Sequence, residues 1–232
     1  NSPETPLYTK SNHLYPLNVA RDEIRRRDFA ILVEGYFDCI VPFQLGVPNI
    51  VASLGTSLTQ NQVKLLGRYT RNVITNYDPD SAGTTAAIRS IDLFLEEGFR
   101  VNVLQLPPGE DPDTFIRREG SGTYQQKLKN SQSYLDFALS QFLKQQKDPS
   151  SPKGKQEVVS RILPYLAKIP NKIEQAEHVT RIASRLQVDE NLILAEMRKV
   201  PHRTEKQPPL NYSLLVDRVT PAEKILLAAV LE

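Results

Sequence analysis

Six acidic side chains stand where short apolar segments of the sequence give way to polar residues. They are Glu34 and Asp38 in Val-Glu-Gly-Tyr-Phe-Asp, Asp78 and Asp80 in Tyr-Asp-Pro-Asp-Ser-Ala-Gly, and Asp111 and Asp113 in Gly-Glu-Asp-Pro-Asp-Thr. Carboxylates that lie close together raise the cost of ionising one another. Hard divalent cations such as Mg2+ relieve that repulsion, and they bind such oxygens together with substrate phosphates. The pattern therefore predicts a divalent-metal site.

Several of these acids also have a purely structural explanation. Asp80 before Ser-Ala-Gly and Asp111 before Pro112 are typical helix N-caps, and Asp is common in turns. Glu34 fits this explanation less well, because it follows four apolar residues and precedes Gly35, so that it caps nothing obvious. The metal hypothesis therefore depends on the acids lying together rather than on any single one.

Four short apolar segments without helical periodicity supply the strands expected to carry the acids. These segments end near Glu34, Gly55, Asp78 and Pro107. Helix-length polar segments lie between them, notably residues 58–69 and 81–97, the latter closed by Gly98. The alternation predicts an α/β fold with a parallel sheet covered on both faces. Ligands of such sheets bind beyond the carboxyl ends of the strands, where the acids are expected.

The second half of the chain has a helical pattern. From residue 123 to about residue 200, apolar residues recur at helical spacing, as in Ile173, Ala176, Val179, Ile182 and Leu186, and this stripe predicts a helical core. Residues 147–154 are expected to connect two helices. Residues 201–213 are expected to form a linker, and a further helix is expected after it.

Composition excludes several classes of protein. No apolar run approaches the roughly 20 residues of a membrane-spanning helix, which excludes a membrane protein. Cys39 is the only cysteine, which excludes a structural zinc site built from two or more cysteines. The net charge of +2 does not by itself indicate nucleic-acid binding, which would need locally clustered Lys and Arg. Without a signal peptide or an initiator Met, the chain is expected to be an excised fragment of a cytoplasmic protein.

Four motifs together resemble a known family. Val-Glu-Gly-Tyr-Phe-Asp, Ser-Leu-Gly-Thr-Ser at 53–57, Tyr-Asp-Pro-Asp-Ser-Ala-Gly and Gly-Glu-Asp-Pro-Asp-Thr resemble the TOPRIM fold, and specifically the bacterial DNA primases, with Pro79 in place of an expected Gly. The resemblance runs from Asn1 to about Val200. It implies a TOPRIM domain of α/β type at residues 29–122 and an all-helical subdomain at 123–200. It also implies that residues 1–28 belong to a truncated polymerase core and that a truncated helicase-binding domain begins at residue 214.

The resemblance implies template-directed nucleotidyl transfer that makes short RNA primers for DNA replication. It gives catalytic roles to Glu34, Asp38, Asp78 and Asp80, and it gives metal-ligand roles to Glu34, Asp78, Asp80, Asp111 and Asp113. The cofactors would be Mg2+ or Mn2+ at two or more sites, and Lys10 would contact a nucleotide phosphate. Asp38 is expected to orient a ligand or a water molecule. Several arginines either contact the backbone of the template or form a solvated charged face. They are Arg21, Arg25, Arg26, Arg27, Arg68 and Arg71.

The implied partners are single-stranded DNA template, nucleoside triphosphates, an RNA primer and a replicative helicase. Zinc would belong only to an upstream domain, and the chain is expected to be a monomer with weak activity or none by itself. One alternative is a Mg-dependent phosphatase with Asp78 as its nucleophile, although Ala82 departs from that pattern. The other is a non-catalytic scaffold that binds nucleic acid or a helicase.

Overall fold

The computed structural model describes residue 5 and residues 9–54, 58–77 and 91–199 of the 232-residue chain. Residues 1–200 form one compact unit, and residues 201–232 are assigned to a second. The expected linker at 201–213 and the domain expected from residue 214 therefore lie outside the described residues, as do Asp78 and Asp80. Across the described part, no helix is long and apolar enough to cross a membrane.

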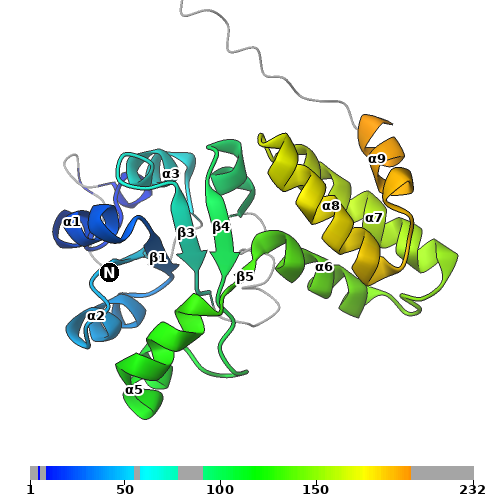
Figure 1. Cartoon of the computed structure of the whole chain (residues 1–232). Helices are drawn as coiled ribbons and strands as arrows, with labels where there is room; N and C mark the ends of the chain where they lie inside the picture. Colours follow the sequence, from blue (N-terminus) through cyan, green and yellow to red (C-terminus); the bar gives the residue numbers. More distant parts are fainter. Residues whose placement is uncertain (1–4, 6–8, 55–57, 78–90, 200–232) are drawn as a thin grey trace, which may run out of the picture. The chain divides into compact units, whose positions relative to one another are not determined.

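A five-stranded sheet organises the first half of the chain (Figure 1). Its strands are β1 (Ala30–Val33), β2 (Ile50–Ala52), β3 (Asn72–Thr75), β4 (Arg100–Val103) and β5 (Gln132–Ser133), in the spatial order β2-β1-β3-β4-β5. The first four strands are parallel, and this confirms the four strands expected from the apolar segments. The fifth strand pairs antiparallel with β4 and was not expected, because two polar residues carry no apolar pattern.

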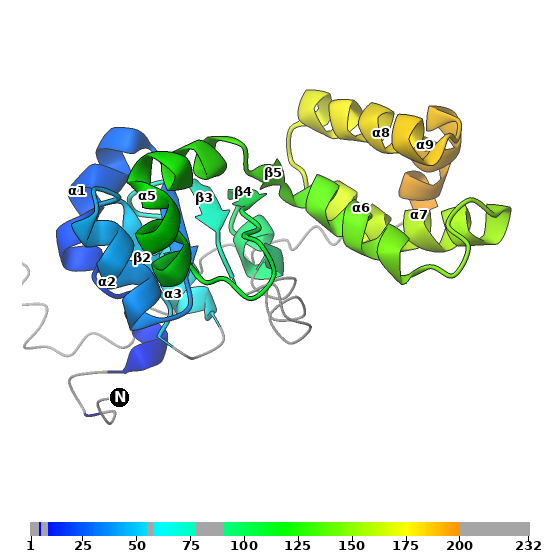
Figure 2. The same cartoon turned by 90° about the horizontal axis from the view of Figure 1, so that it is seen from below.

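Helices cover both faces of the sheet. Along β1, Ala30 and Leu32 face one apolar cluster, and Ile31 and Val33 face the other, as the alternation of side chains in a strand requires. The first cluster includes residues of α1 (Leu17–Arg27), α3 (Gln60–Leu66) and the helical residues 91–96. The second includes residues of α2 (Tyr36–Gln44) and α5 (Pro112–Lys129), which lie side by side in Figure 2.

In the part of the chain that the structure describes, four helices follow the sheet. They are α6 (Tyr134–Gln145), α7 (Pro152–Ala167), α8 (Lys172–Leu186) and α9 (Glu190–Lys199). Side chains of Ser133, Ser151 and Asn171 accept hydrogen bonds from the first-turn amides of α6, α7 and α8, which fixes where these helices begin. The α6 helix contacts β4 and β5, so the apolar cluster on that face of the sheet continues into the helices.

The division between sheet domain and helical subdomain stays a proposal. The boundary expected between residues 122 and 123 falls within α5, whose later residues Tyr124 and Leu128 pack in the second apolar cluster of the sheet. From α6 onward, the helices contact mainly one another. We therefore propose a boundary just after Ser133 rather than at residue 122.

Candidate metal centre

Two helix N-termini bring acids together beyond the carboxyl ends of the strands. The α2 helix begins directly after β1, and Asp38 lies in its first turn. The α5 helix begins after the loop that follows β4, with Asp111 as its N-cap and Asp113 in its first turn. Because α2 and α5 pack against each other, Asp38 comes close enough to Asp111 and Asp113 for their charges to act on it. The partial positive charge of helix N-termini favours carboxylates at such positions.

The proximity of these acids affects the pKa of Asp38. Burial raises the pKa of its carboxyl above the ordinary value, and the negative charge of Asp111 and, more weakly, that of Asp113 raise it further. Hydrogen bonds from the backbone N–H groups of Gly35 and Asp113 lower the pKa and only partly offset these effects. Of these two, Gly35 N donates to Asp38 Oδ2 over 3.1 Å and fixes the rotamer of the side chain. A nearby cation would relieve this repulsion, as a divalent metal held together with further carboxylates would.

Asp111 has the cap geometry that its sequence context indicates. Its Oδ1 accepts a hydrogen bond of 2.7 Å from Thr114 N, and Asp111 N donates to Thr114 Oγ1 over 3.1 Å. Pro112 occupies the first helical position, where the missing N–H costs nothing. Asp113 forms an ion pair with Arg117, one turn further along α5. These contacts confirm the N-cap expected at Asp111, and metal binding by these acids stays a prediction.

Of the other predicted site acids, the structure describes Glu34 but not Asp78 or Asp80. Glu34 is half-buried and follows the last residue of β1, and its carbonyl oxygen accepts from Leu54 N over 3.1 Å. Asp78 and Asp80 lie outside the described residues, but β3, which precedes them, sits between β1 and β4. Among the described residues alone, no group of three or more His, Cys, Asp or Glu side chains is arranged to hold a metal ion. A complete ligand set would therefore need the acids that follow β3.

Lys10 is brought to the same end of the sheet by contacts distant in sequence. It begins the short 3-10 helix η1 (Lys10–Asn12), which contacts α3 near the end of β2. The buried Gln62 donates from Nε2 to the carbonyl oxygens of Lys10, over 3.0 Å, and of His13, over 2.8 Å. Tyr15 pairs with Ala52 at the end of β2. The backbone that carries Lys10 is therefore held at the carboxyl edge.

Sequence reasoning missed two residues that position this site. Gln62 contacts residues about 50 positions away, and no local pattern signals such a contact. Gly35 has an ordinary negative φ, but a Cβ at this position would lie 2.7 Å from Asp38 Oδ2. The glycine therefore leaves room for the Asp38 carboxylate, and its place between two acids in the sequence was the available signal.

Three of the arginines considered as template contacts, Arg27, Arg68 and Arg71, lie away from the acids. The α1 helix ends at Arg27 just before β1 begins, and Arg68 and Arg71 precede the first residue of β3. These positions belong to the amino ends of the parallel strands, opposite the acids. Within α1, Glu23 pairs with both Arg26 and Arg27, at 2.6 and 3.0 Å. A template path that joins these side chains directly to the acidic centre is thus not supported.

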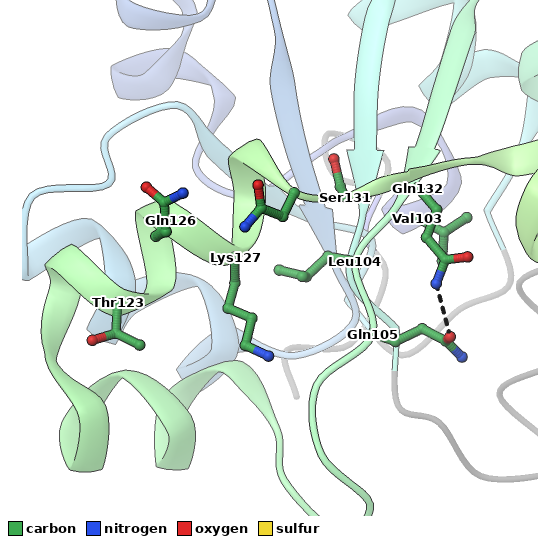
Figure 3. Close-up of a pocket in the computed structure, with 9 residues that line it drawn as sticks. Val103, Leu104, Gln105, Thr123, Gln126, Lys127, Ser131 and Gln132 are labelled. Atoms are coloured by element: carbon green, nitrogen blue, oxygen red, sulfur yellow. Dashed lines mark hydrogen bonds between the residues drawn. The ribbon is translucent and has the colours of Figure 1, made fainter.

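A separate hollow of about 250 Å³ lies between the second half of α5 and strands β4 and β5. Figure 3 shows Thr123, Gln126 and Lys127 projecting from α5, and the side chains of Gln105 and Gln132 joined by a hydrogen bond of 3.2 Å. Amides, hydroxyls and one amine line the hollow together with two apolar side chains, and no acid does. It is therefore distinct from the candidate metal centre.

Comparison with known proteins places this geometry in a family. A Toprim-like family model matches residues 31–116, and a model of the DnaB-helicase binding domain of primase matches residues 135–191. The DNA primase of Clostridium acetobutylicum is 35% identical over 213 residues, which are 89% of this chain and 35% of that protein. The chain belongs to the bacterial DNA primases. It spans about a third of the length of the curated primases it matches.

Solved primase structures share the fold. A DNA primase domain from Pseudomonas aeruginosa superposes with a TM-score of 0.72 at 32% identity, covering 85% of this chain and 62% of that one. A DnaG primase catalytic domain bound to ssDNA gives a TM-score of 0.73 at 32% identity, covering 83% and 62%. The expected TOPRIM fold with a helical part is confirmed. The helicase-binding match falls on α6 to α8 and the start of α9, not on residues 214–232, where the sequence analysis expects that domain.

Proposed function

We propose that this chain supplies the metal-binding part of a primase, which makes short RNA primers by template-directed nucleotidyl transfer. The observation that carries the proposal is the convergence of Asp38, Asp111 and Asp113 beyond the carboxyl ends of the strands, in a chain of the primase family. Glu34, Asp78 and Asp80 complete the proposed site. A primer 3'-hydroxyl would attack the α-phosphate of a nucleoside triphosphate and release pyrophosphate.

The proposed ligands divide between two regions of the edge. Glu34, Asp78 and Asp80 follow the adjacent strands β1 and β3, and Asp111 and Asp113 follow β4. We assign two or more Mg2+ or Mn2+ ions to these carboxylates. When bound, such metals lower the pKa of the attacking hydroxyl and neutralise charge on the triphosphate.

Other residues would orient and bind. Asp38 is already fixed by the backbone N–H of Gly35, so we assign it the orientation of a ligand or a water molecule rather than direct coordination. Lys10 would contact a phosphate of the nucleotide from the η1 segment, which Gln62 holds at this edge. Single-stranded DNA as the template is supported by the related catalytic domain bound to ssDNA.

Thermal melts with and without metal test the proposed site. Millimolar Mn2+ or Mg2+ should raise the melting temperature of the chain, because bound metal stabilises the folded state by mass action. Asp78→Asn and Glu34→Gln should leave the metal-free melting temperature unchanged or raise it, and should reduce or abolish the metal-induced shift. Glu157→Gln, an exposed change on α7, serves as the matched control and should keep the full shift. A full shift in Asp78→Asn together with lower metal-free stability would mean that Asp78 is a structural residue.

We also propose a replicative helicase as a partner. The family model of the DnaB-helicase binding domain of primase covers residues 135–191 and supports contact through these helices. Ile173 and Leu192 lie within or next to this range, are 83% and 63% exposed, and offer apolar surface to a partner. Ile173→Asp and Leu192→Asp should weaken binding to the purified helicase in analytical ultracentrifugation. Val19→Asp, at an apolar position on α1 that is 54% exposed, is the control. Equal binding by all variants would exclude this face.

The comparisons do not favour the phosphatase alternative, since the matched proteins are primases. A non-catalytic scaffold is likewise disfavoured, because a scaffold has no use for acids that destabilise one another at one edge of a sheet. We expect little primer synthesis from the 232-residue chain alone, and we expect it to be monomeric and cytoplasmic.

A further inference from the structure

Three exposed arginines line one open hollow at the amino end of the sheet, opposite the acidic centre. They are Arg68, Arg71 and Arg100, and the hollow of about 520 Å³ runs from the end of α3 to the first residue of β4. In Figure 1 this is the end of β3 and β4 away from their arrowheads. Asp28 is the single acid among the lining residues, so the hollow carries a net positive charge.

The guanidinium groups are available to a ligand. Arg68 has no ion-pair partner among the described residues. Within the described part of the chain, Arg100 pairs only with Glu174, at 3.8 Å, and exposed pairs of this kind contribute little. The Asp28 carboxylate already accepts from Thr70 Oγ1 over 3.0 Å and from Asn72 Nδ2 over 3.1 Å. These neutral donors satisfy Asp28 without an arginine, and its single negative charge leaves the lining with an excess of positive charge.

Arg71 is held in place rather than free in solvent. Its Nη1 donates to the carbonyl oxygen of Glu97 over 2.7 Å, and its guanidinium lies 5.3 Å from the centre of the Phe99 ring. Gly67 leaves the space for it, because a Cβ there would lie 2.9 Å from Arg71 Nη1. Gly67 has helical φ and ψ, so its backbone would accept any residue. Gly67 therefore leaves room for the guanidinium in this position.

We propose that Arg68, Arg71 and Arg100 bind the phosphodiester backbone of a nucleic-acid strand, at a surface separate from the acidic centre. Planar guanidinium groups match phosphate oxygens with paired hydrogen bonds. The lining offers Tyr69 as its one aromatic residue and otherwise polar side chains and glycines, so it has no aliphatic side chain to bury against a protein partner. A nucleic-acid strand therefore fits this surface better than a protein partner. The choice of nucleic acid as the ligand rests on the membership of the chain in the primase family. The proposal does not depend on the metal site.

Binding of a fluorescein-labelled oligothymidylate to the 232-residue chain tests the proposal. Anisotropy is measured over a salt series with EDTA present throughout, so that metal binding at the acidic centre plays no part. Replacing Arg68, Arg71 and Arg100 together by Gln should weaken binding about tenfold or more at low salt. It should also lower the slope of log Kd against log salt by about 2, since each contact to single strands contributes about 0.7.

Two further variants separate position from charge. Replacing Lys144, Lys147 and Lys153 by Gln removes the same charge from exposed sites elsewhere and should change affinity little. Gly67→Ala keeps every charge but displaces the Arg71 guanidinium, and it should weaken binding to an intermediate degree. Equal losses in the arginine and lysine triple variants would overturn the proposal, as would the absence of binding by the parent chain.

Competition identifies the ligand. Unlabelled oligothymidylate should displace the probe at far lower phosphate concentration than inorganic pyrophosphate does. Equal potency of pyrophosphate would indicate a small-anion site, and equal potency of polyglutamate would indicate an acidic protein segment. Either result would contradict binding of a nucleic-acid strand.

Discussion

At the scale of single residues, the acids of the candidate centre serve the fold and the proposed chemistry at once. Asp111 caps α5 through Thr114 N, while its charge raises the pKa of Asp38. An aspartate that only caps a helix is replaceable by asparagine, whereas an aspartate that also binds a metal is not. The two roles can therefore be separated by substitution at this one position.

We expect Asp111→Asn to keep the metal-free stability of the chain, because asparagine is an equally good N-cap and removes repulsion on Asp38. Asp111→Ala should cost about 1 kcal/mol, since it leaves the first-turn amide of α5 without its acceptor. Both should reduce the stabilisation produced by added metal. Urea unfolding with and without Mn2+ measures these effects, and a full metal effect in Asp111→Asn would remove Asp111 from the ligand set.

At the scale of secondary-structure elements, Gln62 joins α3 to the segment that carries Lys10. Its amide makes three hydrogen bonds, two to backbone carbonyls and one from Thr59 N. Gln62→Leu should cost about 2–4 kcal/mol, because each buried polar group left without its partner costs about 1–3 kcal/mol. Amide hydrogen exchange at residues 9–13 should accelerate in this variant. Asn61→Leu removes an exposed bond to Asn12 and should do neither.

The α8 helix carries a titratable group with a predictable effect of pH. Burial lowers the pKa of His178, and the Arg181 charge lowers it further, while Asp136, Glu174 and Glu177 act in the opposite direction. The folded state therefore binds this proton more weakly than the unfolded state does. The stability due to neutral His178 is present above the ordinary value of about 6.5 and is lost as pH falls through the lowered pKa.

His178→Gln should accordingly lose less stability than the parent chain between neutral and mildly acidic pH. Thermal melts at a series of pH values measure the difference, with His13→Gln as a control at an exposed histidine. Parallel curves for the parent and His178→Gln would mean that the burial of His178 has no effect on folding.

Much of this element-scale arrangement could be predicted from the sequence, because it depends on local patterns. Apolar segments gave β1 to β4, and Asp-Pro gave the start of α5. The β5 strand could not be predicted from the sequence, because it consists of two polar residues and forms only by pairing with β4. The position of Arg68 and Arg71 could also have been predicted, because residues that precede parallel strands lie at the amino ends of those strands. The expected strands already placed Arg68 and Arg71 away from the acids.

At the scale of the whole molecule, one apolar cluster joins the sheet to the helices that follow it. It runs from Leu32 in β1 through Phe137 in α6 to Ile182 in α8. Elements that share a core usually unfold together. The described part of the chain should therefore unfold in one transition, although the resemblance suggests a domain and a subdomain.

Phe137→Ala tests this cooperativity and should cost about 3–5 kcal/mol, as truncation of a buried aromatic does. Hydrogen exchange should show the same loss of protection in β1 and in α8. Loss confined to α6–α9, or two calorimetric transitions in the parent chain, would show that the helices fold independently of the sheet.

The opposite placement of acids and arginines also places a local electric dipole along the strands of the sheet. Carboxylates gather at one end of the sheet, and Arg68, Arg71 and Arg100 gather at the other. In the field of a polyanion, such a dipole experiences a torque that turns the arginine end forward before contact. Orientation of this kind raises association rates and weakens as salt screens the field. Metal ions that neutralise the acidic end would shrink the dipole, so an empty and a loaded molecule would approach nucleic acid with different angular preference.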